Sequence, residues 1–169
     1  MECGKALGAT VIATARGKDR LDVASTHGAD HVIDTASEDV RIRVKELTDG
    51  RGADVVFDPI GGDLFEASLR SIAWGGRLLI IGFAGGRVQQ IPANILLVKN
   101  VNAIGFYWGS YRTHDPDRVR QGFETLLAWI GDKRIKPHVS MSVGLDRFLE
   151  ALSALKGRKA TGKIVLTTA

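Results

Sequence analysis

The chain has 169 residues, of which 44% are hydrophobic and 25% are charged. This length and composition support a globular domain with a hydrophobic core and exclude an intrinsically disordered polypeptide. The net charge of +4 comes from 23 cationic residues mixed with 19 acidic ones. Because no basic stripe alternates with aromatic residues, this charge argues against nucleic-acid binding. Apolar runs such as 78–81 are far shorter than the ~20 residues of a membrane span. No secretory segment follows Met1, so we expect a cytoplasmic protein.

Strand signals recur through the first two thirds of the chain. They lie at residues 10–15, 31–34, 54–57, 77–82 and 101–106. Each run is nearly continuous in apolar or β-branched residues, which is typical of strands that are buried on both faces of a parallel sheet.

Helical periods separate these strands. Apolar residues repeat at helical spacing in three stretches, namely Leu21 with Ala24, then Val40, Val44 and Leu47, then Phe65, Leu69 and Ile72. Gly28, Gly50 and Gly75 each predict the left-handed end of a helix. The sequence therefore predicts crossover helices that pack on the sheet.

The pattern changes after Trp108. Asp115 and Pro116 predict the N-cap and first residue of a long helix with Phe123 on its apolar face. A strand at 138–143, a helix with apolar residues from Leu145 to 155 and a strand at 163–167 follow. We thus expect a C-terminal helix-strand-helix-strand extension.

The beginning of the chain predicts an incomplete Rossmann unit. A helix end at residues 5–8, a strand at 10–15 and a basic turn at 16–20 form the second half of a βαβ unit. The first strand and its G-x-G-x-x-G turn should precede them. We expect an α/β fold with a Rossmann-like doubly wound parallel sheet that lacks this strand and turn. In the order 3-2-1-4-5-6 the missing strand lies between residues 10–15 and 54–57. Cys3 is expected in the helix, at least partly buried.

Five strings occur in order at suitable spacing: GADHVI at 28–33, GADVVFD at 52–58, GGRLLIIG at 75–82, PANILLVKN at 92–100 and TGKIVL at 161–166. Together they resemble the C-terminal half of the medium-chain dehydrogenase/reductase superfamily, in its zinc-independent NADPH:quinone oxidoreductase-like branch. The resemblance implies a partial dinucleotide-binding domain over residues 1–108. It also implies that residues 109–169 pack back on a GroES-like domain upstream.

No metal ligands are expected in the chain. The four histidines, His27, His31, His114 and His138, and the lone Cys3 lack the spacing of a metal site.

The basic turn after Ala15 carries the clearest candidate site, with Arg16, Lys18 and Arg20. NAD-preferring Rossmann domains hold the ribose hydroxyls with an acid at the end of this strand. Here Ala15 takes that position and cations follow. Because charge-assisted hydrogen bonds to phosphate contribute about 1.5–3 kcal/mol each, the turn predicts NADP(H). The resemblance implies that Arg20 is a phosphate ligand. An exposed basic turn at a helix start is the alternative.

Other candidates follow the strand ends, where open α/β sheets bind ligands. Pro59, Gly82 and Phe83 lie in small-residue loops, which are equally typical of ordinary turns. The resemblance implies that Phe106 and Trp108 lie beside the nicotinamide, with simple packing as the alternative. It also implies that Arg158 and Lys163 reach cofactor phosphates, with a solvated cluster as the alternative. Because no nucleophile–base pair is evident, we assign no catalytic residue.

These features indicate the cofactor-binding portion of an NADPH-dependent quinone or enone reductase that transfers hydride to an electrophilic carbonyl or alkene. The parent enzyme is expected to be a homodimer through residues 101–106. Two alternatives remain open: a non-catalytic nucleotide-binding or interaction module, and an inactive truncated product. Unpaired strand edges and uncovered faces at Phe123 and Phe148 are expected in this chain.

Overall fold

The structure is a computed structural model that describes residues 1–168, and it confirms the predicted α/β class. The chain divides into two compact units, which we describe separately. Residues 33–125 form the sheet unit. Residues 1–32 and the chain from residue 126 onward form the terminal unit.

The elements in chain order are α1 (Glu2–Ala6), β1 (Ile12–Ala15), α2 (Lys18–Thr26), β2 (His31–Asp34), α3 (Val40–Glu46), β3 (Ala53–Asp58), α4 (Gly62–Ser71), β4 (Ile72–Ile80), α5 (Ala93–Lys99), β5 (Asn102–Gly105), the 3₁₀ turn η1 (Trp108–Ser110), α6 (Tyr111–His114), α7 (Pro116–Gly131), β6 (Val139–Gly144), the 3₁₀ turn η2 (Leu145–Arg147), α8 (Phe148–Lys156) and β7 (Lys163–Thr167).

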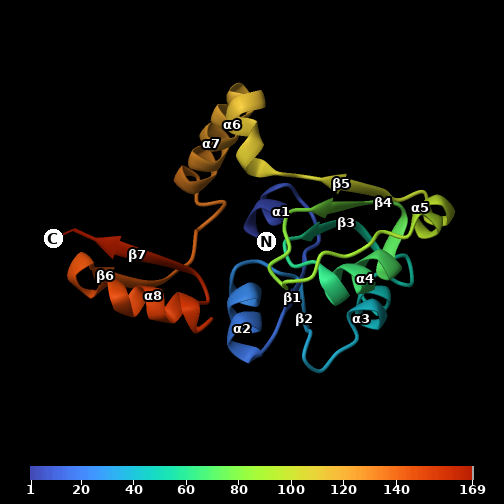
Figure 1. Cartoon of the computed structure of the whole chain (residues 1–169), viewed down its shortest axis with the longest axis horizontal. Coiled ribbons are helices and arrows are strands. Elements are labelled where there is room, and N and C mark those ends of the chain that lie inside the picture. Colours follow the sequence, from blue (N-terminus) through green and yellow to red (C-terminus); the bar gives the residue numbers. More distant parts are fainter. Residues whose placement is uncertain (169) are drawn as a thin grey trace. The chain divides into compact units, whose positions relative to one another are not determined.

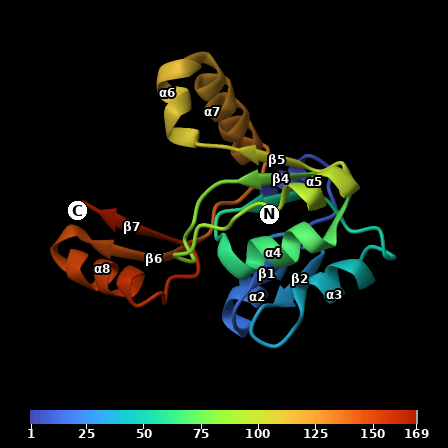
Figure 2. The ribbon, with the colours of Figure 1, turned by 45° about the vertical axis from the view of Figure 1, so that its right-hand side comes forward.

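The sheet unit is built on three parallel strands in the order β3-β4-β5. Helix α4 covers one face of this sheet, as Figures 1 and 2 show. Phe65 and Leu69 of α4 pack with Ile72, Leu78 and Val101 in one buried cluster. The helical stripe predicted from the sequence is therefore the core of this unit.

One predicted helix end is wrong. Helix α4 ends at Ser71, and Gly75 lies inside β4 with a φ of +73°. A Cβ atom on Gly76 would lie 2.6 Å from Cγ1 of Ile72. The two glycines thus let the chain turn back closely on Ile72, so β4 covers residues 72–80 rather than 77–82.

The terminal unit contains β1 with α2, and a parallel β6–β7 pair that α8 contacts. Its buried hydrophobic side chains are few and mostly small: Ala24, Ile135, Val143 and Ala151. Among residues 1–168 the strands pair in the orders β1-β2, β3-β4-β5 and β6-β7.

Local signals at the helix ends are mostly confirmed. The carboxylate of Asp115 accepts the backbone N–H of Arg118 at 3.1 Å, and α7 begins at Pro116 as predicted. Gly28 and Gly50 have positive φ angles close behind α2 and α3.

The expected uncovered apolar faces are also present. Phe123 is 56% exposed and Phe148 is 43% exposed. Cys3, however, is exposed, because α1 has only five residues and makes its side-chain contacts through Glu2 and Lys5. Among residues 1–168, no helix is both long and apolar enough to cross a membrane.

Candidate functional site

The carboxyl ends of β3 and β4 bring two predicted loops together in the sheet unit. The backbone N–H of Ala84 donates to the carbonyl of Pro59 at 3.0 Å, and that of Gly85 donates to Ile60 at 2.9 Å. A Cβ atom on Gly82 would lie 3.4 Å from the carbonyl oxygen of Pro59. The small residues therefore let two backbones meet at the edge where open α/β sheets bind ligands.

A buried carboxylate fixes the first of these loops. Asp58 is only 3% exposed, and its Oδ1 accepts the N–H groups of Ile60 at 2.8 Å and Gly61 at 2.9 Å. Among residues 1–168, its Oδ2 has no hydrogen-bond donor. Because buried polar atoms are nearly always satisfied, this oxygen marks a place for a donor from a ligand or another segment.

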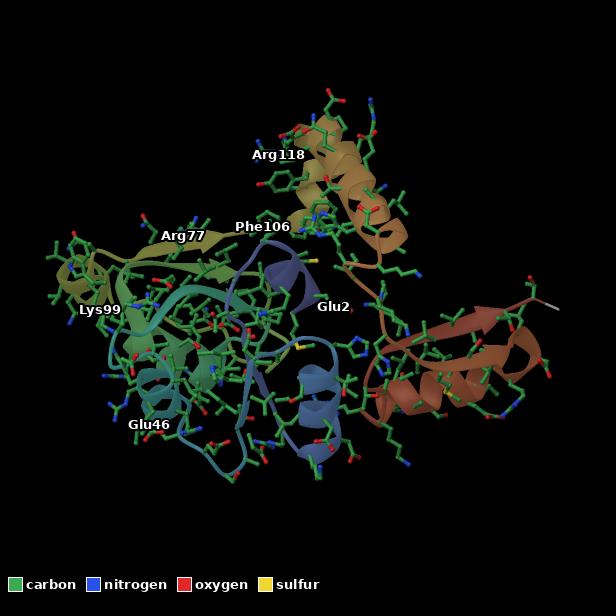
Figure 3. All side chains as sticks on the ribbon, turned by 180° about the vertical axis from the view of Figure 1, so that it is seen from behind. Glu2, Glu46, Arg77, Lys99, Phe106 and Arg118 are labelled. Atoms are coloured by element: carbon green, nitrogen blue, oxygen red, sulfur yellow. The ribbon has the colours of Figure 1, made fainter. Side chains whose placement is uncertain are left out.

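Next to the loop after β4, a hollow of about 770 Å³ opens beyond the ends of β4 and β5. Three of the predicted residues line it, namely Gly82, Phe83 and Phe106. Figure 3 shows Phe106 where β5 leads toward the α6–α7 pair. Trp108 is not a lining residue, but its ring lies 6.4 Å from that of Phe106.

The aromatic residues around this hollow form a packed cluster. The Tyr111 ring lies 5.2 Å from Phe106 and 6.2 Å from Trp108, and Phe123 meets Trp108 edge-on at 6.5 Å. The two interpretations are thus compatible for Phe106, which lines the hollow and also packs in the cluster, whereas Trp108 only packs against it.

Several lining residues were not predicted from the sequence, namely Tyr107, Ser110, Tyr111, His114 and Asp115. They add hydroxyl, imidazole and carboxylate groups to an otherwise apolar wall, which is the usual make-up of a small-molecule site. One sequence signal was available, because these residues directly follow the carboxyl end of β5.

The basic turn lies in the terminal unit, between β1 and α2. Arg16 is exposed, and Gly17 precedes Lys18, the first residue of α2. The Lys18 ammonium lies 2.6 Å from Asp22, which raises the pKa of Lys18, first by the hydrogen bond and then by charge. The guanidinium of Arg20, which is half-buried, donates to the carbonyl oxygen of Arg158.

This contact joins two predicted groups that are far apart in the sequence. Arg158 follows α8 with a φ of +53°, and Lys163 begins β7. The side chains of Arg16, Arg158 and Lys163 are exposed. These four cations therefore belong to one unit, and two of them, Arg16 and Arg20, lie at the N-terminus of α2, which also favours anions. Pro59, Gly82, Phe83, Phe106 and Trp108 belong to the other unit.

Within the described residues, no group of three or more His, Cys, Asp or Glu side chains is placed to hold a metal ion.

Comparison with known proteins places this geometry in a family. The quinone oxidoreductase-like protein 2 homolog of Nematostella vectensis is 44% identical over 162 residues, which cover 95% of this chain and 44% of that protein. The solved structure of Escherichia coli quinone oxidoreductase complexed with NADPH matches with a TM-score of 0.84 and 28% identity, covering 98% of this chain and 51% of that one. A structure described as an NAD-dependent alcohol dehydrogenase matches with a TM-score of 0.81 and 28% identity, covering 99% of this chain and 46% of that one.

The chain spans about half the length of the curated relatives it matches. The family described as zinc-binding dehydrogenases matches residues 1–130, which is most of the chain. The superfamily indicated by the five sequence strings is thereby confirmed. The chain belongs to the zinc-binding dehydrogenase family of medium-chain dehydrogenases/reductases, and its relatives include quinone oxidoreductases.

Proposed function

We propose that this chain is the cofactor-binding portion of an NADPH-dependent oxidoreductase of the quinone or enone reductase type. One observation carries the proposal: Arg20 contacts the backbone carbonyl of Arg158, so the basic turn lies against the loop before β7, which also carries cations. No acid occupies the end of β1, where NAD-preferring domains have one.

The described residues fit the cofactor in two places. Arg16, Arg20, Arg158 and Lys163 would hold the phosphate on the adenosine ribose through charge-assisted hydrogen bonds. Lys18 contributes less because Asp22 already pairs with its ammonium.

In the sheet unit, Pro59 and Gly82 would allow backbone approach to the nicotinamide ribose. Phe83, Phe106 and Trp108 would flank the nicotinamide ring. The free Oδ2 of Asp58 suits a hydroxyl donor at this edge. When bound, NADPH supplies a hydride to an electrophilic carbonyl or alkene. The protein's part is to orient the reactants and to exclude water.

The wider organisation follows from the same proposal. Residues 1–108 serve as a partial dinucleotide-binding domain, and 109–169 pack on a GroES-like domain. The parent enzyme works in the cytoplasm without zinc and forms a homodimer through residues 101–106. Two features support this dimer surface: β5 is an edge strand, and Ile104 within it is 39% exposed.

A second candidate is a non-catalytic nucleotide-binding or interaction module. The exposed faces at Phe123 and Phe148 favour it, since large uncovered apolar surfaces are typical of sites that another chain covers.

Titration with NADPH and with NADH, followed by tryptophan fluorescence, tests the first candidate. We expect NADPH to bind more tightly, and Arg20→Met to reduce this preference by about tenfold, the loss of one charge-assisted hydrogen bond. Lys156→Met, in the last turn of α8, is the matched control and should change nothing. Equal binding of both cofactors by the unmodified chain would rule out a phosphate site at Arg20.

A further inference from the structure

A second hollow lies in the terminal unit, and its lining is basic. The proposed cofactor site uses none of the residues that form it. Its volume is about 590 Å³, and its charged and imidazole side chains are Glu2, Lys5, His27, Arg134, Lys136 and His138. Three of these are cations and one is a carboxylate. The lining is therefore positive even when both imidazoles are neutral.

Two imidazole rings form the centre of this hollow. The ring centroids of His27 and His138 lie 4.9 Å apart with a tilt of 49°. Nδ1 of His27 is 3.3 Å from Oε1 of Glu2, and Nε2 of His138 is 3.4 Å from Oγ1 of Thr161. Figure 3 marks Glu2 on α1. Each ring thus has one nitrogen engaged, and among residues 1–168 the other nitrogen has no hydrogen-bond partner.

The backbone holds this pair in place. The same Glu2 oxygen that contacts His27 accepts the N–H of Lys136 at 2.8 Å. The carbonyl of His138 accepts the N–H of Lys163 at 2.8 Å, and a Cβ atom on Gly162 would lie only 2.6 Å from that carbonyl. The rings are consequently pre-organised by contacts from both ends of the chain.

The cations differ in how free they are to bind a ligand. Lys5 lies 2.7 Å from the Asp30 carboxylate, so its charge is already paired. Arg134 donates to the carbonyl of Ala6 and lies 5.1 Å over the Trp129 ring, which leaves further N–H groups on its guanidinium. Lys136 is exposed, and within the described part of the chain its ammonium has no partner.

A metal ion does not suit this site. Although two imidazoles and a carboxylate are close, no three His, Cys, Asp or Glu side chains in residues 1–168 are placed to share one ion. The ammonium of Lys136 and the guanidinium of Arg134 are instead N–H donors. Donors in a positive hollow are suited to an oxyanion, whose oxygens accept several hydrogen bonds at once.

We propose that this hollow binds a tetrahedral oxyanion, either inorganic phosphate or the phosphoryl group of a phosphate ester. Lys136 and His138 are its ligands, Arg134 adds a further donor, and the His27 ring lies against that of His138.

Calorimetric titration and the NMR signals of the two rings test this with inorganic phosphate at pH 7, in the absence of dinucleotide. We expect phosphate to shift the signals of both rings. Lys136→Met and His138→Gln should each weaken binding about tenfold, the effect of losing one charge-assisted hydrogen bond. Lys156→Met serves as the matched lysine control and should not weaken binding. Arg20→Met removes a cation of the proposed cofactor surface, where phosphate can also bind, so its readout is the phosphate-induced shift of the two rings, which should persist.

If NADPH displaces the phosphate from both rings, the natural ligand is a phosphoryl group of the cofactor rather than a free anion.

Three results would overturn the proposal: no shift of either ring, equal weakening by Lys136→Met and Lys156→Met, or loss of binding only in Arg20→Met. Should His138→Gln fail to fold, the exposed Lys136→Met decides the question alone. The titration with inorganic phosphate contains no dinucleotide, so its failure leaves the proposed cofactor site untouched.

Discussion

The two units of this chain differ in what stabilises them. The sheet unit contains the largest fully buried side chains, among them Phe65, Ile33 and Leu69. The terminal unit buries mainly small residues and depends on polar contacts such as Lys5 with Asp30. Folding stability is therefore expected to reside in one unit, while the cationic groups that suit phosphate lie in the other.

This difference has a physical basis in the packing of the helices. Helix α4 buries its apolar stripe between the sheet and α3, whereas α8 leaves Leu149 and Leu155 exposed. Apolar side chains stabilise a fold roughly in proportion to the area that they remove from water. Half-covered residues in α8 thus contribute little until another surface covers them.

Two phenylalanine substitutions should show the largest difference in stability between the two units. Phe65→Ala should destabilise the chain by about 3–5 kcal/mol, because Phe65 is completely buried. Phe148→Ala, at a ring that is 43% exposed, should cost only about 1 kcal/mol. Denaturant unfolding followed by circular dichroism measures both. Similar losses in the two variants would show that the terminal unit is as well packed as the sheet unit.

A glycine pair tests the backbone of the sheet unit. Gly52 has a φ of +96°, and a Cβ atom there would overlap the carbonyl of Ser71 and lie 2.9 Å from the N of Ala73. Gly52→Ala should therefore cost about 2 kcal/mol or more. Gly50→Ala, with a φ of +81° and open space around it, should cost about 1 kcal/mol from strain alone. Equal midpoints of thermal unfolding for the two variants would contradict the role of Ser71.

Arg158→Gly separates binding from stability in the terminal unit. Arg158 has a left-handed φ of +53° that glycine adopts easily, so stability should change by less than about 0.5 kcal/mol. NADPH affinity should fall about fivefold, since an exposed cation contributes about 1 kcal/mol. Asn100→Gly, at a φ of +52° in the sheet unit, is the matched control. If calorimetry shows that Arg158→Gly leaves the NADPH affinity unchanged, Arg158 is not part of the cofactor site.

The ion pair between Lys5 and Asp30 predicts that folding stability depends on pH. The Lys5 ammonium and the N–H of Val11 hold the pKa of Asp30 below its ordinary 3.8. A lowered folded-state pKa means that the stability is present above about pH 4 and is lost as pH falls through the folded pKa. Asp30→Asn should be less stable than the natural chain at pH 7, and this difference should shrink toward pH 3. A difference that is constant with pH would show that the charge of Asp30 does not matter.

The smallest effect is expected at Lys18, although it lies in the basic turn. Its side chain is 83% exposed and is paired with Asp22. Lys18→Met should therefore change NADPH affinity by less than about twofold, consistent with the small contribution of exposed ion pairs. A tenfold loss in the same fluorescence titration would mean that Lys18 leaves Asp22 to bind phosphate.

Much of the fold was predictable because its signals are local. The strand at 163–167 and the helix start at Pro116 follow directly from β-branched runs and capping residues. The extension of β4 back to Ile72 was not predictable, since its pairing with Ala53 depends on a tight turn at Gly75 rather than on an apolar run.

The candidate site was predictable only in part. Residues at strand ends, such as Gly82 and Phe106, could be found because all parallel strands end at one edge of the sheet. The contact of Arg20 with Arg158 joins residues 138 positions apart, and the pairing of His27 with His138 is equally non-local. No periodicity or spacing reports such contacts, so they required the structure.

The most direct test of the proposed cofactor selection is a binding comparison that isolates a single phosphate group. Adenosine 2′,5′-bisphosphate and adenosine 5′-monophosphate differ only at the ribose hydroxyl that NADPH carries as a phosphate. Calorimetric titration of the chain with both should show the bisphosphate binding at least about tenfold more tightly, the contribution of one charge-assisted hydrogen bond. Equal affinity for the two nucleotides would contradict the assignment of Arg16, Arg20, Arg158 and Lys163 as the phosphate-binding surface.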